Sequence, residues 1–261
     1  MDVTKTAPWT GGKNETLDVV LDGKVHLLQP REGYRFALDS LLLAGFTRVR
    51  DGDRVVDLGT GVGIIPLVLS VRGQRPKRII GVEVQEALAG LAERNVCLNR
   101  REELIDIFQG DMRTFRSSAS SGSFDVVVSN PPYYKISDGR VNPSLEKAIA
   151  RHEITCTLSD VMETAATLLK QGGRCFIIFP AFRAISLLIE LATVSLEPKR
   201  IRWVHPRRGE AANFVLIEAH RRRGEGVQVM APLFVYDEYS HYTPEVKELC
   251  LHGILFNGQR N

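Results

Sequence analysis

Hydrophobic runs alternate with helix-length amphipathic stretches over residues 54–194. Five short runs, rich in Val, Ile and Phe, have the composition of strands covered on both faces, at 54–58, 78–84, 104–109, 124–129 and 174–179. The apolar spacing between them predicts helices at 64–71, 86–99, 158–170 (ended by Gly172-Gly173) and 182–194. Two last runs, 200–204 and 213–219, follow without a helix between them, which indicates an antiparallel strand. The pattern predicts an α/β fold with a doubly wound, mostly parallel seven-stranded sheet and one antiparallel strand.

The segment before this alternating region has a hairpin pattern. Two short apolar runs, 17–20 and 25–28, flank Leu21-Asp22-Gly23-Lys24, and Asp-Gly between such runs is a strong β-hairpin signal. An apolar helix is expected next, through about Phe46. We expect one domain, residues 1–261, made of an N-terminal hairpin and helix, a core and a C-terminal extension, with the boundaries 1–50, 51–220 and 221–261.

The composition is that of a globular protein with ample material for a core, since 44% of the residues are hydrophobic and 25% are charged. No apolar run is long enough to span a bilayer, and the N-terminus lacks the hydrophobic region of a signal peptide. The four cysteines, at 97, 156, 175 and 250, have no metal-ligand spacing. We therefore expect a cytoplasmic protein with reduced cysteines, no metal, no membrane contact and no obligate protein partner.

The fourth predicted strand of the core runs directly into Asn130-Pro131-Pro132-Tyr133. Two successive prolines have no N–H to donate to a ladder, so the strand stops at Asn130, at its carboxyl end. Ligands bind at that edge in open α/β sheets. A stiff turn there would aim the Asn130 amide, the Pro131 carbonyl and the Tyr133 ring into one pocket.

Those groups suit the methylation of an amino group that is conjugated to a ring or a carbonyl. The lone pair of such a nitrogen is delocalised and weakly nucleophilic. The Asn130 side-chain oxygen and the Pro131 carbonyl would accept its two N–H hydrogens and favour a tetrahedral nitrogen. Tyr133 would stack on the planar group, on a turn that Pro132 stiffens.

A glycine-rich turn follows the first strand of the core. Gly59, Gly61 and Gly63 stand between a strand and a helix, where glycines let the backbone approach a ligand closely. Their G-x-G-x-G spacing, with Asp57 before it, differs from the G-x-G-x-x-G of dinucleotide sites. The acidic residue suits a ligand with an ammonium group, such as the methionine part of S-adenosylmethionine.

Acidic residues also end the next two strands. Glu83 lies 24 positions after Gly59 and matches the acidic residue that binds ribose hydroxyls in related folds. Asp111 ends the third strand, where it would accept a hydrogen bond from an adenine amino group. The three acidic positions therefore predict one donor-binding edge.

Five segments of the chain carry a family resemblance: GYRFALDSLLLA (33–44), VDLGTGVG (56–63), NPPY (130–133), ARHE (150–153) and HPRRGEAAN (205–213). Through them the chain resembles the bacterial tRNA(Val) adenine-N6-methyltransferase family over most of its length. The resemblance implies a Rossmann-like, S-adenosylmethionine-dependent methyltransferase that acts on the adenosine 3′ to the anticodon. It also implies donor contacts from Phe36, Asp39 and Asn130, although Phe36-Ala37 departs from the small Gly-Thr-Asp-Gly-like segment of many family members.

Basic residues are concentrated between Lys199 and Gly224, where eight cationic residues accompany two acidic ones. A phosphate backbone requires arginines in loops, and we assign tRNA contacts to Arg207, Arg208, Arg221, Arg222 and Arg223. Arg151-His152-Glu153 is assigned a structural or RNA-contacting role, because an N6 amino group needs no base before attack.

Other functions remain open at this point. Glutamine-N5 methylation of a release factor would use the same Asn-Pro-Pro-Tyr turn, and guanine-N2 methylation of ribosomal RNA is a related third reading. The arginine-rich stretch favours RNA over a protein substrate. Duplex DNA is disfavoured because the core leaves little of the 261 residues for a target-recognition domain. A non-catalytic RNA-binding module would need a degenerate donor site, yet Asp57, Glu83, Asp111 and Asn130 are all present.

Overall fold

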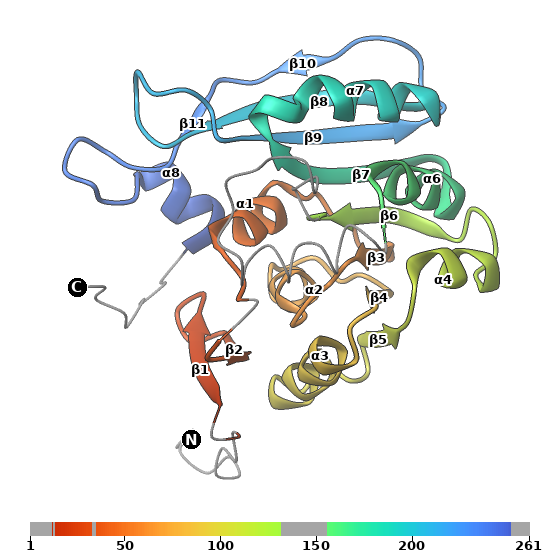
Figure 1. The fold of residues 1–261 in the computed structure, drawn as a ribbon, viewed down its shortest axis with the longest axis vertical. Coiled ribbons are helices and arrows are strands. Elements are labelled where there is room, and N and C mark those ends of the chain that lie inside the picture. The colour runs from red at the N-terminus through yellow and green to blue at the C-terminus, as the bar shows by residue number, and fades with distance from the viewer. Residues whose placement is uncertain (1–11, 13, 33–34, 132–155, 252–261) are drawn as a thin grey trace.

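The computed structural model describes residues 12, 14–32, 35–131 and 156–251. Its central sheet contains seven longer strands: β3 (Arg54–Leu58), β4 (Arg78–Glu83), β5 (Ile105–Gln109), β6 (Phe124–Ser129), β7 (Leu169–Pro180), β8 (Leu196–His205) and β9 (Phe214–Arg221). They lie in the order β8-β9-β7-β6-β3-β4-β5 (Figure 1). β9 alone runs antiparallel to its neighbours, as predicted. Two short strands, β10 (Gln228–Val229) and β11 (Leu233–Phe234), extend the sheet beyond β8.

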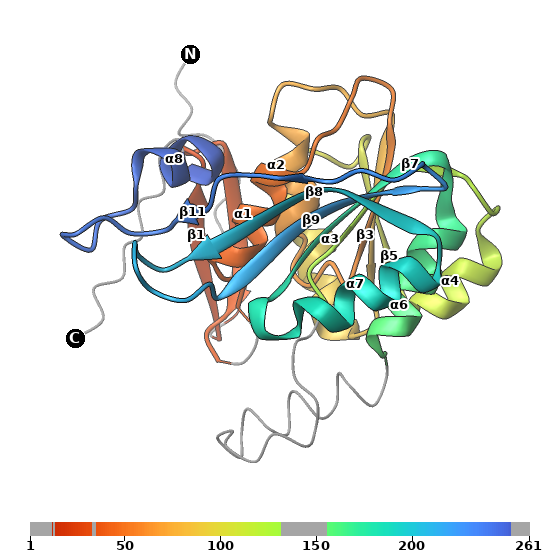
Figure 2. The ribbon, with the colours of Figure 1, turned by 90° about the horizontal axis from the view of Figure 1, so that it is seen from above.

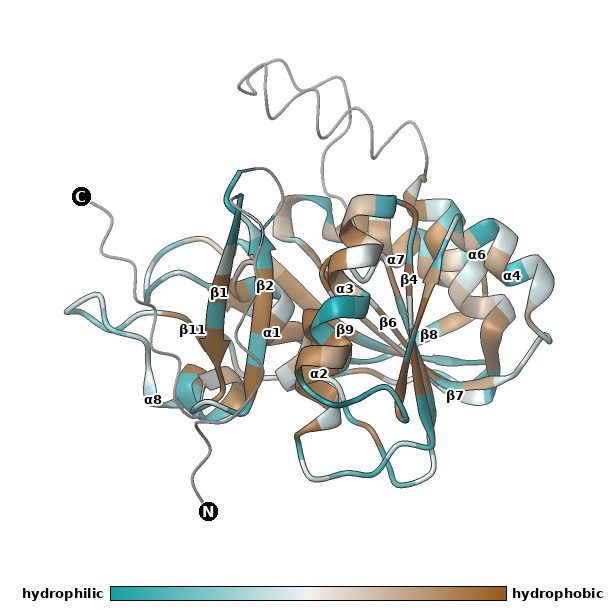
Figure 3. Cartoon of the chain, turned by 90° about the horizontal axis from the view of Figure 1, so that it is seen from below, coloured by the Kyte–Doolittle hydropathy of each residue, from teal (hydrophilic) through white to brown (hydrophobic). Residues whose placement is uncertain are grey.

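Helices cover both faces of the sheet (Figure 2). One face packs against α1 (Leu38–Phe46), α2 (Ile64–Ser70) and α3 (Glu86–Leu98), and the other against α4 (Met112–Ser118), α6 (Leu158–Leu168) and α7 (Ala184–Thr193). In β6, Val126 and Val128 belong to the first core and Val127 to the second, all without exposed surface. Figure 3 shows the resulting hydrophobic colour of the central strands. The uniformly apolar runs therefore reflect burial on both faces.

The chain changes direction across the sheet between β3 and β6, which are parallel neighbours. Ligands of open α/β sheets bind outside the carboxyl ends of strands at such a switch point. We call this side, where the parallel strands end, the carboxyl edge, and the opposite side the amino edge. The ends of β3, β4, β5 and β6 meet at the carboxyl edge, beside the start of α1.

The N-terminal hairpin consists of β1 (Glu15–Val20) and β2 (Val25–Pro30), paired in full register as predicted. It docks on α3 through Asn95, which is completely buried. The Asn95 amide oxygen accepts a hydrogen bond from Leu28 N at 2.7 Å, and its nitrogen donates to Leu28 O and Val62 O at 3.0 and 2.9 Å. Because Val62 lies between two glycines of the turn after β3, one side chain holds both the hairpin and that turn.

The segment after β9 returns to α1. It forms a short helix α8 (Pro244–Val246) and a π-helical turn η2 (Lys247–Leu251), which pack on α1. Gly45 permits the contact, since a Cβ at that position would lie 2.5 Å from the Leu249 carbonyl oxygen. The 221–261 extension is thus, as far as residue 251, part of the same packed body, while its boundary stays a prediction.

The structure differs from the predictions at the end of one helix and in one helix that was not predicted. The helix before β7 ends at Leu168, and Gly172-Gly173 lies inside β7, near a register shift against β6. Its N-cap is Thr157, which forms a capping box with Asp160. Helix α4 was not predicted, because its seven residues include only Met112 and Phe115 as large apolar side chains. Among the described residues, no helix is long and apolar enough to cross a membrane.

Candidate functional site

The glycine turn after β3 closes over the end of β4. The backbone N–H groups of Gly59 and Thr60 donate to Val82 O at 2.9 and 3.0 Å. Gly59, Gly61 and Gly63 all have positive φ, at 78, 58 and 84°. Glycine adopts this left-handed region without the steric cost that a Cβ brings. The turn therefore needs the three glycines that the sequence singled out.

Glu83 braces this turn from the end of β4. One oxygen of its buried carboxylate accepts a hydrogen bond from Gly61 N at 2.9 Å, and the other accepts from Gln85 N at 2.9 Å. A carboxylate has about four lone-pair positions, so each oxygen retains a further acceptor position. The predicted ribose contact is compatible with this arrangement, in which Glu83 also shapes the turn.

Asp57 is the most unusual acid of the described chain. Its side chain has no exposed surface, and neither carboxylate oxygen has a hydrogen-bond partner among the described residues. Burial raises the pKa of Asp57 to about 7; the nearby Thr60 hydroxyl opposes the rise and the charge of Glu83 adds to it. A buried acceptor left without donors is costly. A cationic ligand near the glycine turn would relieve that cost, so the residues present fit a donor that carries an ammonium group.

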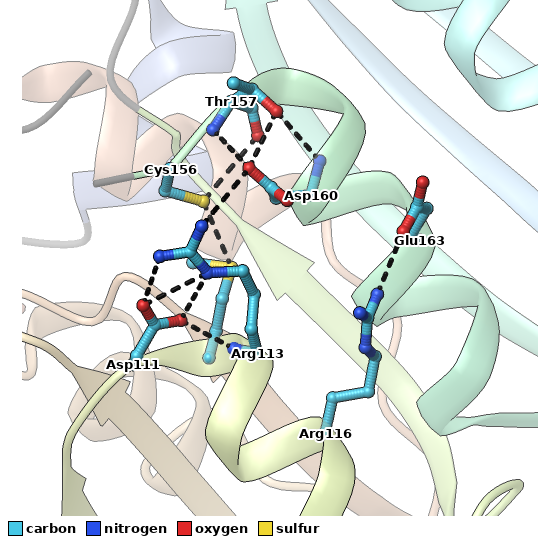
Figure 4. Close-up of polar contacts among 8 residues, drawn as sticks. Asp111, Arg113, Arg116, Cys156, Thr157, Asp160 and Glu163 are labelled. Carbon is cyan, nitrogen blue, oxygen red and sulfur yellow. Dashed lines mark hydrogen bonds and ion pairs between the residues drawn. The ribbon is translucent and has the colours of Figure 1, made fainter. Parts of the chain in front are cut away.

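Asp111 is already engaged at the end of β5 (Figure 4). It caps α4 by accepting from Arg113 N at 2.8 Å, and it receives the Arg113 guanidinium at 2.5–3.1 Å. Arg113 also lies 4.0 Å from Asp160 of α6. The Arg113 guanidinium holds the pKa of Asp111 below its usual range. Asp111 is therefore ionised and structurally committed, with only part of its carboxylate left for an adenine amino group.

Cys156, two residues before α6, also links α4 to α6. The Cys156 thiol lies 3.5 Å from the Met112 sulfur, and Arg116 pairs with Glu163 at 3.1 Å (Figure 4). Burial raises the pKa of Cys156 to about 12. A thiol with such a pKa is almost entirely protonated at neutral pH, so it is a packing group and not a nucleophile.

Asn130 follows the last residue of β6 and reaches across to α1. Its amide nitrogen donates to the Ser40 hydroxyl at 3.1 Å, while Ser40 N donates to Asp39 at 2.8 Å. Ser40 thus links Asn130, after the end of β6, to the start of α1, where Asp39 lies; the donor contacts that the resemblance implies for Asp39 and Asn130 stay predictions. Phe36 instead lies in the hydrophobic core, 8% exposed. Pro131 is buried, and Pro132 and Tyr133 lie outside the described residues, as do Arg151-His152-Glu153.

The arginines assigned to RNA occupy two different edges. Arg207 and Arg208 follow β8 at the carboxyl edge, whereas Arg221–Arg223 end or follow β9, which runs the opposite way to the amino edge. The antiparallel strand therefore separates the two groups by the full length of the sheet. Arg221 is additionally engaged with the carbonyl of Leu169.

Two other arginines of the basic stretch are structural. Arg200 is 9% exposed, pairs with Glu218 at 2.6 Å and lies over the Phe46 ring at 4.5 Å. Arg202 is 7% exposed and pairs with Glu245 at 2.5 Å. The local charge excess therefore overstates the basic surface that is available to a partner.

Ser40, Asn95 and Arg113 also belong to the site's framework, although sequence reasoning did not select them. Ser40 bonds Asn130 and Arg113 pairs with Asp111, whereas Asn95 bonds the Val62 carbonyl between two of the predicted glycines. Only Ser40 had a signal, since it lies within the segment that carries the family resemblance. The described residues contain no group of three or more His, Cys, Asp or Glu that would hold a metal.

Comparisons with known proteins show the family to which the chain belongs. The family model of the methyltransferase small domain matches residues 38–194. The chain is 31% identical over 222 residues to the tRNA1(Val) (adenine(37)-N6)-methyltransferase of Tolumonas auensis, covering 84% of this chain and 90% of that one. It is 33% identical over 142 residues to the Bacteroides thetaiotaomicron protein of the same name, covering 54% and 58%.

Solved structures show the same fold. A protein of Agrobacterium tumefaciens described as a predicted O-methyltransferase superposes with a TM-score of 0.66 and 22% identity, over 81% of this chain and 94% of that one. At this identity the likeness is one of architecture. It supports the mostly parallel methyltransferase-type sheet described above.

Proposed function

Because the chain belongs to the methyltransferase small domain family and to the tRNA1(Val) (adenine(37)-N6)-methyltransferases, we propose that it methylates N6 of the adenosine 3′ to the anticodon of tRNA(Val). The methyl donor is S-adenosylmethionine. The observation that carries the proposal is the position of Asn130, at the switch point of the sheet and tied to α1 beside the glycine turn. A tRNA substrate also fits the cytoplasmic location that the sequence predicts.

The donor would be held at the ends of β3 and β4. The left-handed glycines let the ligand approach the backbone, and Glu83 keeps the turn in place while offering acceptor positions to ribose hydroxyls. Asp57, buried and without a partner, would balance the charge of the ammonium group. Asp39 and Asn130 border the same space from α1 and β6. S-adenosylmethionine, when bound there, supplies an electrophilic methyl group.

Asn130 and Pro131 would prepare the acceptor nitrogen. The Asn130 side-chain oxygen and the Pro131 carbonyl accept the two N–H hydrogens of the adenine amino group, which draws the lone pair out of the ring plane. These hydrogen bonds strengthen as positive charge develops on the nitrogen, so they stabilise the transition state more than the ground state. Ser40 fixes the amide from its donor side. The product nitrogen then loses a proton, for which no strong base is required.

Arg207 and Arg208 would bind the RNA next to the target. Arg207 lies over the Tyr236 ring, which stacks on Tyr242 with centroids 5.2 Å apart, and Arg208 lies over Phe234. Their loop joins β8 to β9, two to three strand spacings from β6, or roughly 10–14 Å. That distance corresponds to nucleotides near the target adenosine. The rings preorganise both guanidinium groups, which lowers the entropy lost on binding phosphate.

The deciding experiment is methyl transfer to defined substrates. The purified chain should convert one adenosine of a tRNA(Val) transcript to N6-methyladenosine, detected by nucleoside mass spectrometry. A transcript with guanosine at that position should stay unmodified. Total tRNA from a strain that lacks the chain should have lost the same nucleoside. Transfer to the glutamine of a release factor, with none to tRNA, would overturn the proposal.

A further inference from the structure

A polar cavity lies at the amino edge, away from the site at the switch point. It has a volume of about 480 Å³ and lies between the hairpin turn, the end of α2 and the end of α3. These three elements lie next to one another at one side of the molecule (Figure 1). α2 begins at the carboxyl edge, after β3, so its C-terminal end and the following loop reach the amino edge. We call this cavity the amino-edge pocket.

Three cationic side chains line the amino-edge pocket: Lys24 from the hairpin turn, Arg75 from the loop after α2, and Arg101 after α3. Within the described part of the chain, none of the three side chains has an ion-pair or hydrogen-bond partner, and no Asp or Glu lines the cavity. The nearby Asp51 carboxylate is bound to the backbone N–H of Arg75, at 2.8 Å. The positive charges are therefore left uncompensated.

Arg101 differs from an ordinary surface arginine. Its Nε is buried and has no hydrogen-bond partner among the described residues. A buried donor without an acceptor loses its hydration and gains nothing in return. Among the described residues, the buried arginines Arg174, Arg200 and Arg202 each pair with a carboxylate at 2.5–2.6 Å, although Arg200 Nε is itself without a partner. The absence of such a carboxylate beside Arg101 indicates that its acceptor comes from outside the chain.

Neutral donors add to the pocket. Gly73, at φ +92°, opens the loop after α2, and the backbone N–H groups of Gly73 and Gln74 donate to no acceptor among the described residues. Free N–H groups next to a left-handed residue form an anion-binding concavity. The Ser70 hydroxyl also lines the cavity, but its hydrogen is already donated to Leu67 O at 2.7 Å. Guanidinium, ammonium and backbone N–H donors together suit an oxyanion with several acceptor oxygens.

We propose that the amino-edge pocket binds a phosphate group, with Arg101 as its central ligand and Lys24 and Arg75 as its outer ones. A polynucleotide backbone and a free diphosphate present the same chemistry. The two sources differ in whether the pocket contributes to the binding of tRNA. The proposal stands on residues that contact neither Asn130 nor the glycine turn, so it is independent of the proposed methyl transfer.

The test compares Arg101→Gln and Arg75→Gln with Lys77→Gln. Lys77 is exposed on the same loop and does not line the cavity, so its variant removes an equal charge outside the pocket. Calorimetry with inorganic pyrophosphate and filter binding with tRNA are run on each protein, and S-adenosylmethionine binding reports the intact fold. We expect each pocket variant to lose about tenfold in affinity for one of the two phosphate ligands, while Lys77→Gln changes less than twofold.

Loss of pyrophosphate binding alone would identify a free phosphate ligand, and loss of tRNA affinity would identify the RNA backbone. Arg75 is exposed, and its side chain has no hydrogen bond or ion pair with the described residues, so its variant tests the pocket even where Arg101→Gln unfolds the chain. The proposal is overturned when wild type and the pocket variants bind both ligands as Lys77→Gln does.

Discussion

The ends of β3 and β5 lie two strands apart at one edge of the sheet, yet their acids have opposite surroundings. Asp57 is fully buried without a partner, and burial raises its pKa to about 7. Asp111 is clamped by Arg113, which lowers its pKa. The buried carboxylate at the end of β3 therefore lacks hydrogen-bond partners, whereas the carboxylate at the end of β5 is already paired. We call the first position, with the neighbouring ends of β4 and β6, the interior of the site and the second its margin. Only the interior gains greatly from a ligand, so substitutions there should have the larger effects.

The largest effect on the rate of the chemical step is expected at Asn130, in the interior. Asn130→Ala should lower the single-turnover methylation rate by on the order of 10²–10³, the usual cost of losing one preorganised polar contact. Donor affinity and the melting temperature should stay close to wild type. Ser40→Ala is the matched control, since it removes only the anchor of the amide and should cost less. A wild-type rate for Asn130→Ala would make the turn purely structural.

Substitutions in the glycine turn and at Glu83, which holds it, should have the next largest effects, and these should fall on donor binding. Glu83→Ala should weaken S-adenosylmethionine binding by roughly 1–3 kcal/mol, because it removes hydrogen bonds to a charged group and releases Gly61 N. Gly61→Val should abolish donor binding, since a β-branched residue is strained at φ 58°. Calorimetry measures both, with Glu83→Gln as the control that keeps an acceptor. Unchanged affinity in the two variants would remove the donor site from this turn.

Asp57 should make donor binding depend on pH. Its folded pKa lies above the ordinary carboxyl value, so the protein without donor holds a proton there that an ammonium ligand must displace. Affinity should rise with pH and level off above about 7; one pH unit below, it should be about tenfold weaker. Asp57→Asn should bind weakly at every pH. A wild-type affinity that is flat between pH 5.5 and 8 would contradict the assignment.

The same raised pKa affects stability, with a defined sign. Between the unfolded and folded pKa values the unfolded chain has released the proton that the folded chain retains, so stability falls as pH rises toward about 7. Asp57→Asn removes this penalty. Its free energy of unfolding should therefore improve relative to wild type more at pH 8 than at pH 4, as measured by urea denaturation.

The loop between β8 and β9, which carries Arg207 and Arg208, should give a smaller and less selective effect. Replacing Arg207 and Arg208 with Ala should weaken tRNA binding and reduce the slope of log affinity against log salt by about two, one for each lost phosphate contact. Donor affinity should not change. The control is Arg222→Ala with Arg223→Ala, at the amino edge. Equal losses in both pairs would mean that RNA contacts both edges.

Asp111 should show the smallest effect. Asp111→Ala removes the N-cap of α4 and should cost about 1 kcal/mol of stability, with at most a few-fold loss of donor affinity. Asp111→Ser retains a capping oxygen and should recover the stability. A drop in donor affinity as large as that of Glu83→Ala would show that Asp111 contributes as much to donor binding as the interior residues do. That result would contradict the difference drawn between the two acids.

Sequence reasoning located the strand ends well, because burial on both faces leaves continuous apolar runs and the glycine turn has its own spacing. It located Asn130 because two prolines must end a strand. It counted Arg200 in the local excess of positive charge, although that side chain is buried against Glu218, because cross-strand pairing depends on a register that composition does not encode.

The position of Arg221–Arg223 was available from the sequence. The predicted antiparallel strand already carries its end to the amino edge, so residues at its two ends do not share a surface. Asn95 and Arg113 gave no such signal, because their partners are distant in the chain and lie on elements that only the packing brings near.

Through Asn95 the N-terminal hairpin supports the glycine turn after β3. The Asn95 amide joins Leu28 to Val62, so the hairpin supports a turn that begins nearly thirty residues later. A fragment that begins at residue 38, where the family match begins, would keep only the Val62 partner of this amide and would lose the hairpin that packs on it. The part of this chain that holds the donor turn in place therefore extends beyond the segment that the family model matches.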